Sequence, residues 1–96
     1  MKNIKLTELE FQRLENWVRS KNKTAIIVLF INDSASITIG KTRYKTDNLS
    51  STNEWLSFFT KMKMFGYAEN KLNKQKGILN YDFTDKAVNF VSSYNQ

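Results

Sequence analysis

The sequence contains no cysteine, no histidine and no proline. Without cysteine there are no disulfides and no thiolate metal ligands. Without histidine, the common Ser–His and Cys–His pairs of nucleophilic enzymes and most zinc sites are excluded as well. The tripeptide Gly40-Lys41-Thr42 lacks the upstream glycine and the following helix of a phosphate-binding loop. We therefore expect no enzyme, no cofactor, no metal ion and no small-molecule substrate.

Long apolar runs are also missing. The longest spans residues 25–31, far short of the roughly 20 apolar residues that a membrane-spanning helix needs. The first residues lead into a polar helix pattern and do not resemble a signal peptide. We expect no membrane segment and, with no cysteine to form disulfides, a cytoplasmic protein.

Negative charge is scarce. The 96 residues include 15 Lys and Arg but 9 Asp and Glu, for a net charge of +6 and a pI near 9.7. Such a balance favours a polyanionic partner, although the abundance of Lys and Asn also fits an AT-rich genome. The basic residues form four groups, which are Arg19, Lys21 and Lys23; Lys41, Arg43 and Lys45; Lys61 and Lys63; and Lys71, Lys74 and Lys76. Segregated charge indicates a one-sided binding surface.

Three helices are predicted from their capping residues. Thr7 and Glu10 have the spacing of a capping box for the first, and Ser51 and Glu54 for the second, which we expect to end at Gly66. The third is expected to open at residues 84–85. Its apolar stripe, with the spacing i, i+3, i+4, i+7, consists of Ala87, Phe90, Val91 and Tyr94.

Between the first two helices the pattern changes to β-structure. Residues 25–31 are rich in β-branched and aromatic side chains and predict a buried strand, with a short buried helix as the alternative. Residues 37–44 alternate around Gly40-Lys41, a sequence that suits a type II′ hairpin turn. Residues 67–72 and 77–83 predict a second hairpin. The chain is thus expected to be one domain, residues 1–96, of the α+β class with the order α-β-β-β-α-β-β-α.

Residues 51–91 carry a resemblance to a known family. A capped helix ends in Met64-Phe65-Gly66-Tyr67, a hairpin with a basic tip follows, and Tyr81-Asp82-Phe83-Thr84 leads into a last helix. This order resembles the back half of the winged-helix DNA-binding family, with its recognition helix, Gly-Tyr turn, wing hairpin and final helix. The resemblance covers about two-fifths of the chain and implies a winged-helix-like fold with a C-terminal wing. If residues 25–31 are a strand, the chain is a divergent variant with an extra hairpin.

The resemblance also implies DNA-binding residues. The recognition helix would present Asn53, Ser57, Thr60 and Lys61 to base edges and phosphates. The wing would contribute Lys71, Asn73, Lys74, Gln75 and Lys76. The first hairpin could add Lys41, Arg43 and Lys45. The ordinary alternatives are a solvated helix face, a polar loop, and an edge strand guarded by charge.

We therefore expect sequence-specific binding of double-stranded DNA by a small regulator or accessory factor of a plasmid, phage or other mobile element. Val88 widens the apolar side of the last helix beyond one small core, which predicts a homodimer through that helix. The alternative is a protein-interaction module, such as a phage-encoded inhibitor that uses its basic face. RNA binding ranks third, because no aromatic-rich exposed strand stands out.

Overall fold

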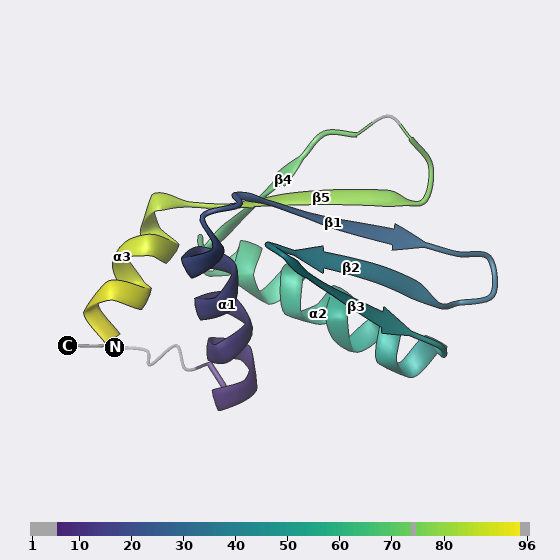
Figure 1. Cartoon of the computed structure of the whole chain (residues 1–96), viewed down its shortest axis with the longest axis horizontal. Helices are drawn as coiled ribbons and strands as arrows, with labels where there is room; N and C mark the ends of the chain where they lie inside the picture. Colours follow the sequence, from purple (N-terminus) through teal and green to yellow (C-terminus); the bar gives the residue numbers. More distant parts are fainter. Residues whose placement is uncertain (1–5, 74, 95–96) are drawn as a thin grey trace.

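The computed structural model of the protein describes residues 6–73 and 75–94. The elements are, in order, α1 (Glu8–Ser20), β1 (Thr24–Leu29), β2 (Ala35–Ile39), β3 (Thr42–Thr46), α2 (Leu49–Met64), β4 (Ala68–Lys71), β5 (Ile78–Phe83) and α3 (Asp85–Tyr94) (Figure 1). The predicted α+β class is confirmed. Within residues 25–31, for which a strand and a short helix were both open, residues 25–29 lie in the strand β1 and residues 30–31 lie beyond its end. None of the described helices is long and apolar enough to cross a membrane.

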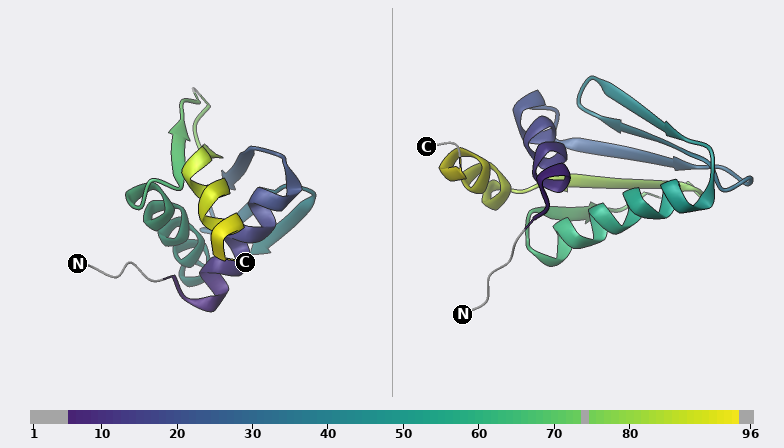
Figure 2. Two further views of the ribbon diagram at one scale, coloured as in Figure 1. Left: turned by 90° about the vertical axis from the view of Figure 1, so that its left-hand side faces the viewer. Right: turned by 90° about the horizontal axis from the view of Figure 1, so that it is seen from below.

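The described strands form one antiparallel five-stranded sheet in the order β3-β2-β1-β5-β4. The first three strands are a meander, and β1 also pairs with β5, which brings the second hairpin alongside the first. Because β3 and β4 lie at opposite edges, α2 must cross one face of the sheet to connect them. It contacts both edge strands, and Figure 2 shows it running along one side of the sheet.

Only one face of the sheet is buried. On β1, Ala25 and Ile27 are completely buried, whereas Ile26 between them is 40% exposed. On β2, Ile37 is buried and its neighbours Ser36 and Thr38 are partly exposed. This period-two alternation is what an antiparallel sheet with one solvated face produces. The protein therefore has two layers, with the helices on one side of the sheet (Figures 1 and 2).

The core between the two layers is largely aromatic. Trp17 of α1 is fully buried and packs edge-on against Phe59 and Phe83, with ring centroids 5.5 and 5.9 Å away. Its indole N–H donates to the carbonyl of Lys23 at 3.1 Å, so its one polar group is satisfied. Trp55 is also buried, with the Arg13 guanidinium 3.7 Å from its ring centroid. Both tryptophans hold the layers together.

Three of the predicted helix ends are correct, including the opening of α3 at Asp85, and one is wrong. The capping box of α1 is present: the Thr7 hydroxyl accepts from the Glu10 amide at 3.1 Å, and the Thr7 amide donates to the Glu10 carboxylate at 2.9 Å. The second helix ends next to Gly66, as expected. It does not begin with a capping box at Ser51, because Asn48 is the N-cap and accepts from the Ser51 amide at 2.8 Å. Asn is a strong N-cap residue, so the helix starts at Leu49.

Candidate nucleic-acid interface

The outward side chains of the sheet define its open face, which no described helix covers. In the sheet register, Ile26 of β1 stands beside Thr38 and Asn80, Thr38 beside Arg43, and Asn80 beside Lys71. Cross-strand partners in an antiparallel pair point to the same face, so these five side chains form one row across all five strands. We call it the central row. It has a cation at each edge and uncharged side chains in the middle.

The neighbouring rows carry opposite charge. Towards the β1–β2 turn, the next row consists of Lys45, Ser36, Val28 and Ile78. On the other side, Thr24, Asp82 and Glu69 form an acidic row. Lys71, in the central row, is next to the acidic row, and its Nζ lies 3.9 Å from the Asp82 carboxylate. The open face is thus basic towards the β1–β2 turn and acidic at the opposite end. An anionic ligand is favoured at the basic end and repelled from the acidic one.

The middle of the open face is suited to hydrogen bonding. Thr38, Ser36 and Asn80 supply hydroxyl and amide groups, and the Asn80 Oδ1 atom is buried without a hydrogen-bond partner among the described residues. Ile26 adds an exposed aliphatic surface. None of the outward positions of the described strands carries an aromatic side chain. Just past the end of β1, however, Phe30 is 51% exposed and lines a depression with Ser36, Arg43 and Lys45. The face can therefore bond to polar groups and touch methyl groups, and it has one exposed aromatic ring beside its basic end.

The cations at the ends of the central row are spaced more widely than the major groove of duplex DNA. Arg43 on β3 and Lys71 on β4 are separated by four inter-strand steps of the sheet, or about 19 Å. The major groove of B-DNA is about 12 Å wide. Cations spaced wider than the groove can contact the phosphates on both of its sides, while the strands between them span the mouth of the groove.

The sequence-predicted residues of the two hairpins lie at or beside this face. Arg43 and Lys45 point outward from β3, and Lys71 points outward from β4. The β4–β5 loop places Gln75 and Lys76 in solvent, and an Asn73 side chain that accepts from the Gln75 amide at 2.8 Å shapes its turn. Lys41 is exposed in the β2–β3 turn. Lys74 lies outside the described residues.

The predicted recognition-helix residues lie on the opposite side of the molecule. The inner side of α2, with Trp55 and Phe59, packs against the sheet. Its outer side has a depression of about 420 Å³ lined by Asn53, Leu56, Ser57, Thr60, Lys61 and Met64. This side and the open face meet at the β1–β2 loop, where Phe30 and Ser34 line one depression with Arg43 and Lys45 and another with Asn53 and Leu56. The structure thus places the sequence-predicted residues on two surfaces that adjoin at this loop.

Lys61 differs from the other predicted phosphate ligands because it has an acidic partner. Its Nζ lies 2.7 Å from the Glu10 Oε1 atom, and its side chain is 32% exposed. Burial of the Glu10 carboxyl acts to raise its pKa, but hydrogen bonds from Lys61 and Thr7 and the charge of Lys61 outweigh burial and lower the pKa below 4.5. The pair connects α1 to α2. Lys61 is thus engaged in the fold and is less available to phosphate than Arg43 or Lys45.

We expect Glu10→Gln to destabilise the protein by about 0.5–1 kcal/mol at pH 7 and by almost nothing near pH 3. Gln still closes the capping box, so the variant removes only the charge. A lowered carboxyl pKa contributes stability above its ordinary value of 4.5 and loses it as the pH falls through the lowered value. Urea unfolding at both pH values measures this difference. An equal loss at both would contradict the ion pair, and Glu54→Gln on the exposed side of α2 is the control.

The middle of the open face was missed by the sequence analysis. Ser36, Thr38 and Asn80 were not singled out, although the alternation in residues 35–39 marks Ser36 and Thr38 as outward. No family model, no curated protein and no solved structure matches the chain. Within residues 6–73 and 75–94, no cluster of three or more acidic side chains could hold a metal ion.

Proposed function

We propose that the protein binds double-stranded DNA through the open face of its sheet. The central row carries this proposal, because it has a cation at each edge, hydrogen-bonding side chains between them, and no helix above it. Net positive charge supports a nucleic acid as the partner. The outward positions of the described strands carry no row of aromatic side chains, which supports duplex DNA over single strands, although Phe30 is exposed beside the basic end of the face. Sheets that read DNA by placing strands in a groove are an established mode of recognition.

In this arrangement Arg43, Lys45 and Lys71 neutralise phosphates and fix the register of the protein on the duplex. Thr38 and Asn80 lie over the mouth of the groove between these phosphates, and Ile26 adds an exposed aliphatic surface beside them. Asp82 and Glu69 repel phosphates from the far end of the face. The DNA would then cross the face near the β1–β2 turn.

The winged-helix resemblance supports a second DNA-binding surface, the outward side of α2. Asn53, Ser57 and Thr60 are exposed there and can bond to base edges. The two surfaces respond differently to substitution: Asn53→Ala with Ser57→Ala changes sequence preference only if α2 enters the groove.

Under either arrangement, we propose a small regulator or accessory factor of a plasmid, phage or other mobile element that acts in the cytoplasm.

A homodimer through α3 stays a prediction. Ala87 and Val91 are buried within the chain, and Phe90 stacks on Tyr67 with ring centroids 4.8 Å apart. Val88 and Phe90, which are partly buried, and Tyr94, which is exposed, are therefore the apolar residues of α3 that retain surface for such a contact. Two copies would offer two half-sites and so multiply a modest affinity.

DNA binding should weaken steeply with salt. We expect log affinity to fall with log salt at a slope of roughly −3 to −4, because about four cations displace counterions from the duplex. The cations concerned are Arg43, Lys45, Lys71 and Lys76. Fluorescence anisotropy with a pool of random duplexes at several salt concentrations measures the slope. A flat dependence, or no binding even at low salt, would remove DNA as the partner.

A further inference from the structure

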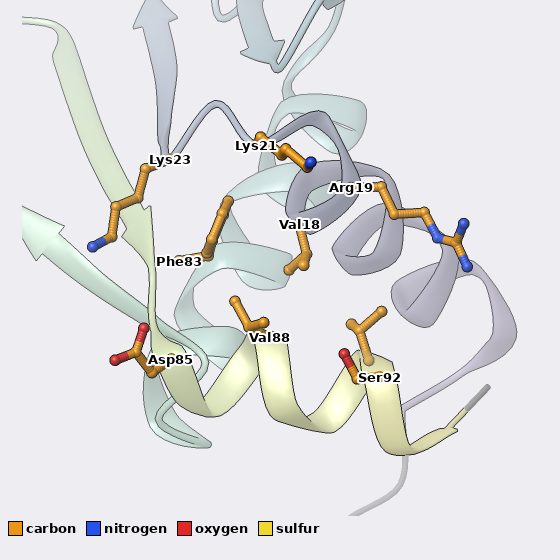
Figure 3. A pocket seen from close by; sticks show the side chains of 9 residues that line it. Val18, Arg19, Lys21, Lys23, Phe83, Asp85, Val88 and Ser92 are labelled. Carbon is orange, nitrogen blue, oxygen red and sulfur yellow. The ribbon is translucent and has the colours of Figure 1, made fainter. Parts of the chain in front are cut away.

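A groove between α1 and α3 forms a second site, away from the open face. It has a volume of about 680 Å³ and is open to solvent. It is lined by Val18, Arg19, Lys21, Lys23, Phe83, Asp85, Val88, Val91 and Ser92 (Figure 3). None of these residues belongs to the rows of the open face. A ligand in this groove would therefore leave those rows uncovered.

The floor of the groove is apolar. Val18 from α1, Phe83 from the end of β5 and Val88 from α3 point toward one another in Figure 3. Phe83 and Val91 are mostly buried, whereas Val18 and Val88 are only partly buried and are packed against the core. This leaves an apolar depression that solvent reaches, of a size that receives one or two large side chains.

The rim of the groove is basic. Arg19, Lys21 and Lys23 follow one another along the end of α1 and the segment leading to β1, and all three are exposed. Asp85 is the acidic residue among those that line the groove. Arg19 also pairs with Glu15 at 3.0 Å, so the uncompensated charge is concentrated on the two lysines. An apolar floor beside such a rim is complementary to a ligand that joins carboxylates to a bulky apolar group.

We propose that this groove binds an acidic segment of a partner protein, in place of the homodimer contact at Val88. The segment would insert one or two large apolar side chains between Val18 and Val88 and set its carboxylates against Lys21 and Lys23. A protein segment fits better than a small molecule, because the groove is open, whereas pockets for small ligands enclose most of the ligand surface. The protein would then hold DNA and a second protein at separate sites.

Selection of random peptides displayed on phage tests this proposal. With the folded protein as bait, we expect enriched peptides that combine Asp or Glu with a large apolar residue. Synthetic versions of these peptides should bind Val88→Lys and the double variant Lys21→Glu/Lys23→Glu at least about tenfold more weakly than the wild type. They should bind Lys63→Glu, an exposed substitution on α2, with unchanged affinity. All variants should bind DNA through the open face as before, apart from a small general effect of charge.

Three results would overturn the proposal. The first is the absence of any enriched peptide. The second is enriched peptides that bind Val88→Lys and Lys21→Glu/Lys23→Glu as tightly as the wild type. The third is a wild-type dimer in light scattering that Val88→Lys converts to a folded monomer, since a second copy would then occupy the groove. Because Val88 also packs on the core, circular dichroism must show that its variant is folded; the double lysine variant tests the site without touching the core.

Discussion

Reversing the charges of Arg43 and Lys45 is expected to reduce DNA affinity by about a hundredfold or more. Each side chain supplies a charge-assisted contact to phosphate, of about 1.5–3 kcal/mol, and the two losses together exceed about 3 kcal/mol. Arg43→Glu and Lys45→Glu also place two carboxylates where the backbone of the DNA would run. Both residues point to solvent from the edge strand β3, so the fold should be little affected. Anisotropy titrations with labelled duplex at low salt measure the effect.

A matched control separates a local contact from general charge. The double variant Lys21→Glu/Lys63→Glu also replaces two exposed lysines by glutamate, away from the open face. Each reversal lowers the net charge by two, so both double variants carry +2 where the wild type has +6. An equal loss of affinity in both would show that only total charge matters. A loss confined to Asn53→Ala/Ser57→Ala would instead make α2 the reading element and refute the open face.

Several parts of the fold could be predicted because they depend on neighbouring residues. The capping box of α1 needs only Thr7 and Glu10, and the turn between β2 and β3 needs only Gly40 and Lys41. Most of residues 25–31 formed a strand, β1, as their β-branched composition indicated, and only the last two residues fell outside it. In each case the decisive interaction spans a few positions along the chain, which is the range over which sequence patterns are informative.

The candidate site was only half predictable, because it depends on long-range pairing. Arg43 and Lys45 alternate with Tyr44, so their common direction was apparent from the strand pattern. The position of Asn80 beside Ile26 depends on the pairing of β5 with β1, which the sequence does not encode locally. The same pairing sends α2 across the buried face and turns Asn53 and Ser57 away from the hairpin lysines. Sheet order therefore decides which basic residues share a surface.

Gly40→Ala is expected to destabilise the protein by about 4 kcal/mol, of the roughly 5–15 kcal/mol that a domain of this size has. Gly40 has φ of +61° and opens the two-residue turn between β2 and β3, as a type II′ turn requires. A side chain at positive φ costs about 1–3 kcal/mol. An added Cβ would also lie 2.4 Å from the Cβ of Ser20 and 2.6 Å from its Oγ, which adds overpacking of about 1–3 kcal/mol. Thermal unfolding should show a drop in Tm of roughly 15–30 °C.

A double-mutant cycle with Ser20→Gly separates strain from crowding. Ser20 at the end of α1 is held in place, since its hydroxyl donates to the carbonyl of Trp17 at 2.6 Å and accepts from the amide of Asn22 at 3.1 Å. In the Ser20→Gly background the crowded atoms are gone, so Gly40→Ala should cost about 1–3 kcal/mol less than in the wild type. Gly66→Ala is the reference for strain alone, because Gly66 has φ of +83° but its added Cβ would meet only the flexible side chain of Lys86, at 3.3 Å. The contrary result is that Gly40→Ala destabilises the protein no more than Gly66→Ala and shows no coupling to Ser20→Gly. The turn between β2 and β3 would then not be packed tightly against Ser20 of α1.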